Sequence, residues 1–289
     1  MPPLSDNLLI LGTMIIYGVF SGGSAIILKK GIIRAGGIPI TNFFRDLLPA
    51  TWRLVSTPLW LFGGFIALIG FLIYAYALNS YEVSVVKPLV NTNLLFTFLF
   101  AYLIFHEKLS SVEWTGVSTL VAGILLTAFS PGIESADLIN VPLLYLLFPM
   151  TLILASIMIF VMFIVKRGSA EFVFPVFAGI FFGMGTFFTK SLLIGYSELG
   201  TLTYALLFLY SLLMLMLTYG LAALGQQLAF EKGRLSVISP ISNSLTVITS
   251  LVGANWIFFE TFNEIRLLGI GCILVSLFIL RREIDQPKI

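Results

Sequence analysis

Residues 84–91, with the sequence SVVKPLVN, return as residues 236–243, with the sequence SVISPISN. The two copies share Ser, Val, Pro and Asn at the same places. Further upstream, the pentapeptide GVFSG at residues 18–22 returns as GIFFG at residues 179–183. Because two separate stretches recur in the same order, the sequence predicts that the chain consists of two related halves.

Long apolar runs contain and surround these stretches. Hydrophobic residues make up 58% of the 289 residues and charged residues only 10%, with a mean hydropathy of +1.04, which is far more apolar than a soluble domain. Runs of about 20 apolar residues are long enough to cross a bilayer, and in lipid they must be helical so that each segment satisfies its own backbone. The sequence therefore predicts an all-α, polytopic membrane bundle of nine transmembrane helices. These are residues 8–28, 60–79, 83–105, 114–129, 141–165, 172–193, 204–230, 235–259 and 265–280.

Basic residues orient the predicted spans. Lys and Arg follow the first, third, fifth, seventh and ninth spans, whereas the alternate loops contain only Arg266. Short basic loops stay in the cytoplasm, so we expect an external N-terminus and a cytoplasmic C-terminus. The default location of such a multi-pass protein is the plasma membrane. Residues 31–58 are interrupted by Gly and Pro and mix aromatic with basic side chains. They are predicted to contain a short helix in the cytoplasmic interface.

The two predicted halves have opposite orientations. The first span and its repeat partner, residues 172–193, cross the membrane in opposite directions. Residues 1–130 form the first repeat with four spans, and residues 131–289 form the second with five, so the span at residues 141–165 has no counterpart. Both repeats belong to one integral membrane domain. Inverted repeats are typical of carriers whose substrate site lies near the midplane between the halves.

Polar side chains near the repeated stretches are the candidates for that site. Pro88 and Pro240 each remove a helical hydrogen bond and are candidate hinges, although a proline is also tolerated in a first turn. Asn91 and Asn243 lie about one turn deeper, where an amide is costly unless it faces the bundle or a cavity. Substrate binding and a purely structural hydrogen bond between helices both remain open for them. The other candidates for substrate binding are Asn93, Ser242, Tyr17, Tyr74, Gln226 and Gln227.

Two lysines complete the set of candidates. Lys190 is the more informative, because it lies near the external end of an apolar run in a region otherwise poor in Lys and Arg. Its ammonium could bind a carboxylate or phosphate of a substrate, pair within the protein, or extend to the headgroups. Lys87, near the outer end of the third span, is a weaker candidate of the same kind. Close helix packing is predicted at the small-xxx-small pairs Gly18 with Gly22 and Gly179 with Gly183.

Several kinds of chemistry are not supported by the sequence. No Asp or Glu lies centrally in a predicted span, and the chain has one His and one Cys. Walker, zinc and nucleophile motifs are missing, so we expect no catalytic residue, no metal site, no cofactor and no enzymatic activity. The net charge of +2 comes from short loops rather than from a basic face, which argues against nucleic acid as a partner.

The repeated motifs carry a family resemblance that covers nearly the whole chain. They are YAL at residues 76–78, VKPL at 86–89, EKL at 107–109 and Gly116, with echoes at Pro240, Glu260 and Gly269. This pattern resembles the EamA-type carriers of the drug/metabolite transporter superfamily. The resemblance implies a ten-helix inverted-repeat fold with a central cavity for amino acids, nucleotide sugars, phosphorylated metabolites or similar solutes. The missing first helix departs from that fold.

A second, shorter resemblance points to another substrate. Residues 22–31 (GGSAIILKKG) and 189–191 (TKS) are similar to the NIPA-like magnesium transporters, which tend to have nine spans. This similarity implies divalent cation transport, but the lack of a central carboxylate argues against it, whereas Lys190 favours an organic anion.

The leading hypothesis is a secondary transporter or facilitator that moves a small polar, anionic or zwitterionic metabolite by alternating access. The alternatives are a magnesium or other divalent cation transporter and a membrane scaffold without transport activity. The expected partners are the lipid bilayer and a small-molecule or ion substrate, and a homodimer is compatible with the sequence.

Overall fold

The computed structural model describes residues 4–36, 49, 51–105, 111–130, 139–164, 170–232 and 235–282. Every regular element in these ranges is a helix, so the all-α prediction is confirmed for them. The helices are α1 (Leu4–Arg34), α3 (Pro58–Ser80), α4 (Val83–Leu89), α5 (Thr92–Phe105), α6 (Ser111–Ala128), α7 (Val141–Ile164), α8 (Ala170–Ser197), α9 (Leu202–Lys232), α10 (Leu235–Phe258) and α11 (Glu264–Arg282).

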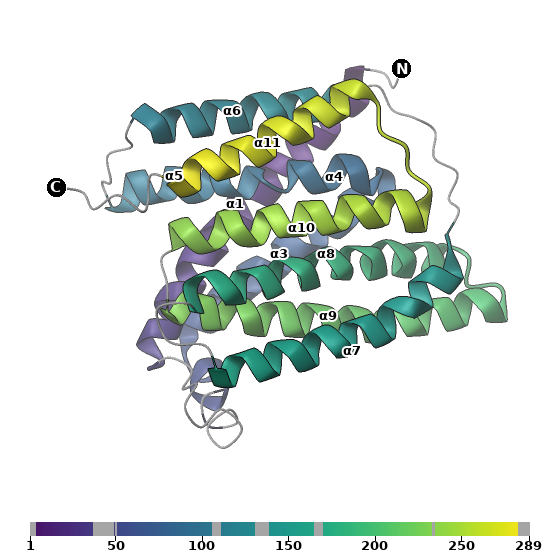
Figure 1. The fold of residues 1–289 in the computed structure, drawn as a ribbon, viewed down its shortest axis with the longest axis horizontal. Coiled ribbons are helices and arrows are strands. Elements are labelled where there is room, and N and C mark those ends of the chain that lie inside the picture. Colours follow the sequence, from purple (N-terminus) through teal and green to yellow (C-terminus); the bar gives the residue numbers. More distant parts are fainter. Residues whose placement is uncertain are drawn as a thin grey trace.

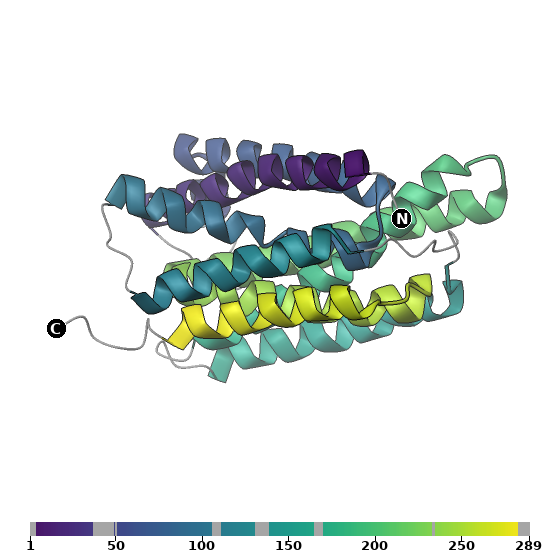
Figure 2. The ribbon, with the colours of Figure 1, turned by 90° about the horizontal axis from the view of Figure 1, so that it is seen from above.

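The long helices run side by side along the longest axis of the molecule (Figure 1). Successive helices alternate in direction, except that α5 continues in the direction of α4, and α1 and α8 run in opposite directions. The junctions α3–α4, α8–α9 and α10–α11 lie at one end of the bundle, on the right in Figure 1, and α1 ends and α3 begins at the other end. Seen from above, α1 and α3 lie together on one side of the bundle (Figure 2).

Among the described residues, six helices are long and apolar enough to cross a membrane. These spans are Leu8–Arg34, Pro58–Ser80, Val141–Met162, Phe172–Ser197, Leu202–Phe230 and Ile238–Phe258, and Trp114–Ala128 is a shorter apolar helix. The chain is therefore a multi-pass membrane protein. The count of nine spans stays a prediction, because α4–α5 is divided and α11 carries charges at both of its ends.

The third predicted span is interrupted one turn after its proline. Helix α4 ends at Leu89, and α5 begins at Thr92. Between them the backbone N–H of Asn91 donates to Pro88 O at 3.2 Å, and the N–H of Leu94 donates to Asn91 O at 3.0 Å. These bonds span three residues instead of four, so the backbone tightens where the proline removes an α-helical donor. In the second half, Pro240 lies inside the continuous helix α10.

Close helix contacts occur at the four predicted glycines. Helix α1 packs on α3 and α5, and α8 packs on α9 and α10. A Cβ atom added to Gly22 would lie 2.7 Å from Asn93 O, and one added to Gly179 would lie 2.5 Å from Ser242 O. Added Cβ atoms at Gly18 and Gly183 would come within 2.8 Å and 2.5 Å of neighbouring side chains. Glycine therefore sets how closely α1 approaches α5 and α8 approaches α10.

The predicted interfacial segment at residues 31–58 is wrong at its start. Residues 31–34 belong to α1, because Ile32 is fully buried and Gly31 packs directly on α3, where an added Cβ atom would lie 2.8 Å from Trp60 Cα. Residues 51–55 are helical, with Trp52 exposed, and residues 37–48 and 50 lie outside the described part of the chain. The repeat match at Glu107 also lies outside it.

Candidate functional site

A cavity of about 460 Å³ lies inside the bundle, between helices of both predicted halves. Helices α1, α3, α4 and α5 line one part of it, and α8, α9 and α10 line the other. Its volume lies in the range typical of small-molecule sites. Eight of the ten candidates for substrate binding line this cavity: Tyr17, Tyr74, Lys87, Asn93, Gln226, Gln227, Ser242 and Asn243.

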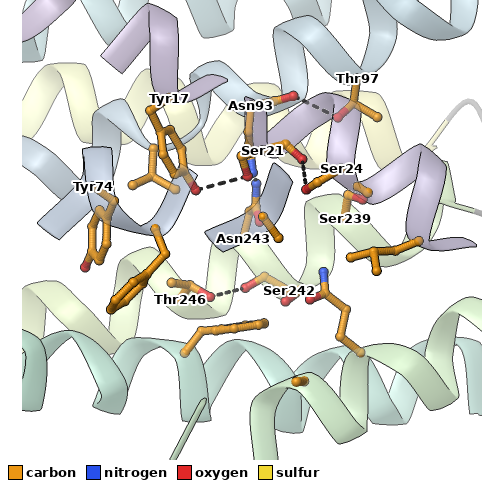
Figure 3. A pocket seen from close by; sticks show the side chains of 18 of the residues that line it. Tyr17, Ser21, Ser24, Tyr74, Asn93, Thr97, Ser239, Ser242, Asn243 and Thr246 are labelled. Atoms are coloured by element: carbon orange, nitrogen blue, oxygen red, sulfur yellow. Dashed lines mark hydrogen bonds between the residues drawn. The ribbon is translucent and has the colours of Figure 1, made fainter. Parts of the chain in front are cut away.

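The amides of Asn93 and Asn243 meet in the cavity wall (Figure 3). The Nδ2 atom of Asn243 donates to Asn93 Oδ1 at 3.0 Å, joining α10 to α5. The repeat in the sequence matched Asn243 with Asn91 instead, whereas the structure pairs Asn243 with Asn93, which follows the tightened turn at residues 90–91. A direct bond between the predicted halves therefore lies in the wall of the cavity, where a polar ligand can compete for it.

Hydroxyl groups supply further donors and acceptors on two sides of the amide pair. On α1, Ser21 Oγ donates to the Tyr17 hydroxyl at 3.2 Å, and on α10 Thr246 Oγ1 donates to Ser242 O at 2.8 Å (Figure 3). The Oε1 atom of Gln227 is buried without a hydrogen-bond partner in the structure. Burying such an oxygen is costly unless a ligand or a water molecule donates a hydrogen bond to it.

Lys87 brings a positive charge to the cavity. Its side chain is 3% exposed, and its Nζ atom lies 4.5 Å from the centroid of the Tyr74 ring. The Tyr74 hydroxyl in turn donates to Thr186 Oγ1 on α8 at 3.2 Å, which holds the ring in place. Within the described ranges, the buried ion pair with a carboxylate involves Arg266 and not Lys87. A cation–π contact stabilises an ammonium but does not neutralise it, so this end of the cavity favours an anion.

Asn91 and Lys190 do not line the cavity. Asn91 is fully buried, its Nδ2 atom donates to Pro88 O at 2.9 Å, and its Oδ1 atom has no partner. Lys190 donates from Nζ to Tyr81 O at 3.0 Å, near the junction of α3 and α4. The structure therefore brings eight candidates together and leaves these two outside, with contacts of a structural kind.

Sequence reasoning missed several polar residues of the cavity. Ser21 and Ser24 lie on α1, Thr97 on α5, and Ser239 and Thr246 on α10. Each lies three or four residues from another residue of the lining, on the same helix face. That spacing is a signal in the sequence, but hydroxyl residues are common in apolar helices and identify no site by themselves.

A polar cluster lies near Lys87, around the start of α4, and is formed by Glu82, Ser84, Ser130, Glu260 and Arg266. Arg266 is fully buried and forms an ion pair with Glu82. Its Nη1 atom also donates to Ser84 Oγ at 2.8 Å, and its Nε atom donates to Ser130 Oγ at 3.2 Å. These bonds tie α11 to the start of α4 and the end of α6.

Glu260 joins the same cluster to the start of α4. Its Oε1 and Oε2 atoms accept the backbone N–H groups of Val83 and Ser84, each at 2.8 Å. These are free donors in the first turn of α4, so a carboxylate from a distant loop caps that helix. Burial raises the pKa of the Glu260 carboxyl, while these N–H groups and the charge of Lys190 oppose the rise. Two features of the sequence hinted at this cluster, namely the solitary Arg266 and the repeat position of Glu260.

Among the described residues, no three His, Cys, Asp or Glu side chains lie close enough together to bind a metal ion.

Comparison with protein families gives a match for the first part of the chain. Residues 7–129 match the EamA-like transporter family, of the drug/metabolite transporter superfamily. The chain has an EamA-like transporter domain. This domain covers α1 to α6, and therefore Tyr17, Tyr74, Lys87 and Asn93 of the cavity. The family resemblance in the sequence is confirmed for residues 7–129, and this match to a transporter family supports a function in transport rather than catalysis. The similarity to NIPA-like transporters stays a prediction.

Three curated relatives match shorter stretches. The chain is 33% identical over 76 residues to the probable 4-amino-4-deoxy-L-arabinose-phosphoundecaprenol flippase subunit ArnE of Aeromonas hydrophila, which is 26% of this chain and 66% of the relative. The ArnE proteins of Aeromonas salmonicida and Pseudomonas fluorescens are 32% and 33% identical over 76 and 58 residues, covering 26% and 20% of this chain. The chain spans 66% of each Aeromonas relative and 51% of the third. No solved structure gives a significant match.

Proposed function

We propose that this chain is a secondary transporter or facilitator that moves a polar solute with an anionic or zwitterionic group by alternating access. The cavity carries this proposal, because it combines a buried ammonium with amide and hydroxyl groups from both predicted halves. A scaffold would be expected to have an apolar, closed interface between the halves. Polar groups in a lipid-embedded interior are costly, so a cavity lined with them supports the binding of a polar substrate.

Each group of residues has a role in this proposal. Lys87 binds the anionic group beside the Tyr74 ring, while the amides of Asn93 and Asn243 exchange their mutual hydrogen bond for bonds to the solute. The backbone between α4 and α5 is where one half moves, because the turn after Pro88 has already lost α-helical bonds. Pro240 is the matching hinge in the second half. The four-plus-five inverted repeat remains part of this proposal, with α1 and α8 as partners.

We propose that the polar cluster of Glu260 and Arg266 closes the cavity at its end of the bundle. We assign this end to the external side, because the basic loops of the sequence lie at the other end. The conformation is then one in which the external path is shut. Transport in this scheme requires the polar cluster to separate so that the site faces the opposite side.

Solute flux in proteoliposomes tests the function. The full chain would be reconstituted and tested for uptake and exchange against a panel of amino acids, organic phosphates, nucleotide sugars and Mg²⁺. We expect flux of at least one solute with a carboxylate or phosphate, and a fall of at least about tenfold in Lys87→Gln. Lys190→Gln is the matched control, since its side chain contacts a carbonyl outside the cavity. No flux in any condition would refute the proposal, and Mg²⁺ flux alone would replace it by cation transport.

A second candidate substrate is a sugar linked to a lipid phosphate. The curated relatives are named as flippase subunits for such a compound, and the alignments to them cover about a quarter of this chain or less. The specific observation in its favour is the composition of the cavity, where Leu28, Leu68, Phe71, Phe182 and Phe230 form apolar walls beside the polar groups. The relatives are named as subunits, and a homodimer of this chain stays a prediction.

A further inference from the structure

The cavity reaches the outer surface of the bundle between α3 and α9. Leu68 on α3 and Ala223 on α9 both line the cavity, yet Leu68 is 52% exposed and Ala223 is also exposed. A side chain that is exposed and also lines the interior cavity lies at an opening. We name the opening bounded by Gly64, Ala67, Leu68 and Ala223 the lateral mouth.

The lateral mouth lies at the depth of the hydrocarbon layer. Leu68 is ten residues from the start of α3, and Ala223 is nine residues from the end of α9. At 1.5 Å per residue, both lie about 15 Å from the same end of the bundle, which is half of a ~30 Å hydrocarbon core. The neighbouring exposed side chains are apolar, such as Phe65 and Leu72 on α3 and Met216 on α9. The mouth therefore opens toward lipid tails rather than toward water.

Open space surrounds the glycine of the mouth. Helix α3 packs on α1, and α9 packs on α8, so the two helices that flank the mouth are supported from behind. A Cβ atom added to Gly64 on α3 would meet no atom within 4 Å. Gly64 differs from Gly22 and Gly179, whose added Cβ atoms would clash, so close helix packing does not explain it.

From these observations we infer that the site takes an amphiphile, whose anionic head lies in the cavity beside Lys87 while its apolar chain passes through the lateral mouth into the bilayer. The inference rests on the proposed function and specifies its substrate class. The physical basis is the free-energy cost of burial. A polar head can enter the membrane interior only where polar partners bind it, whereas an apolar chain loses nothing by staying in lipid. A solute without a chain would need no opening at this depth.

Two probes with the same head test the inference. Glycerol 3-phosphate and 1-oleoyl-lysophosphatidic acid share a glycerol phosphate, and only the second has a long apolar chain. Saturable binding of each would be measured to the full chain in phosphatidylcholine nanodiscs, with empty nanodiscs subtracted. The variant Gly64→Phe fills the mouth without a clash at Cβ. Gly12→Phe is the matched control, because Gly12 on α1 also has open space around it but does not line the cavity.

We expect Gly64→Phe to weaken lysophosphatidic acid binding by about tenfold or more, and to leave glycerol 3-phosphate binding within about twofold. Gly12→Phe should change neither, and both variants should keep the thermal stability of the parent chain. If Gly64→Phe and Gly12→Phe bind lysophosphatidic acid equally, or if only glycerol 3-phosphate binds to the parent chain, the lateral mouth is not a path for a lipid chain. The proposed carrier function survives either of those results. Absence of binding of both probes, together with absence of flux, would overturn both proposals.

Discussion

Replacing Arg266 by Met should remove a large part of the stability of the closed end. The guanidinium is fully buried and contacts Glu82, Ser84 and Ser130, which come from two other segments. Removing one partner of a buried ion pair costs about 3–5 kcal/mol, because the remaining charge stays desolvated. The Glu82 side chain is 13% exposed, so water can reach it in part. We therefore expect the free energy of unfolding to fall by about 3 kcal/mol, the lower limit of that range.

The assay is unfolding in mixed micelles by increasing SDS fraction, followed by circular dichroism. Arg266→Met, Glu82→Gln and the double variant form a cycle, in which we expect the double variant to lose about 1–3 kcal/mol less than the sum of the single losses. Glu264→Gln, an exposed residue on the same helix, is the control and should change the free energy by no more than about 0.5 kcal/mol. If Arg266→Met costs no more than this control, or if the single losses simply add, then the buried pair does not hold the two segments together.

Three further predictions concern other contacts, and each is checked by thermal unfolding in detergent. Glu260→Gln should cost about 1–3 kcal/mol, because an amide has one acceptor oxygen for the two N–H groups that begin α4, and an unchanged midpoint would contradict this. Gly179→Leu should lower the midpoint strongly, because its Cβ atom would lie 2.5 Å from Ser242 O, whereas Gly200→Leu, in open space, should not. Asn243→Leu should cost about 1–2 kcal/mol by leaving its partner amide unpaired, and equal stability would mean that this bond is exchanged with water.

Much of the cavity could be predicted because membrane energetics limits where polar residues are tolerated. An asparagine or a lysine in an apolar helix must face the bundle, a cavity or the headgroups, so Asn93, Asn243 and Lys87 were candidates from their positions alone. The ranking of the two lysines could not be predicted. Lys87 and Lys190 both lie near the ends of apolar runs, and only the tertiary structure shows that Lys87 lines the cavity while Lys190 donates to the backbone carbonyl of Tyr81.

The class of the protein follows from the sequence without any tertiary information. It is a multi-pass membrane protein with an EamA-like domain and with helices as the regular elements of its described residues, because the length and apolarity of each run depend only on neighbouring residues. Which polar groups meet is a property of the tertiary structure. The pairing of Asn93 with Asn243, the capping of α4 by Glu260 and the lateral mouth between α3 and α9 all join residues that are more than a hundred positions apart. Such contacts depend on the rotation and separation of whole helices, which glycine contacts and tightened turns set and which no local pattern records.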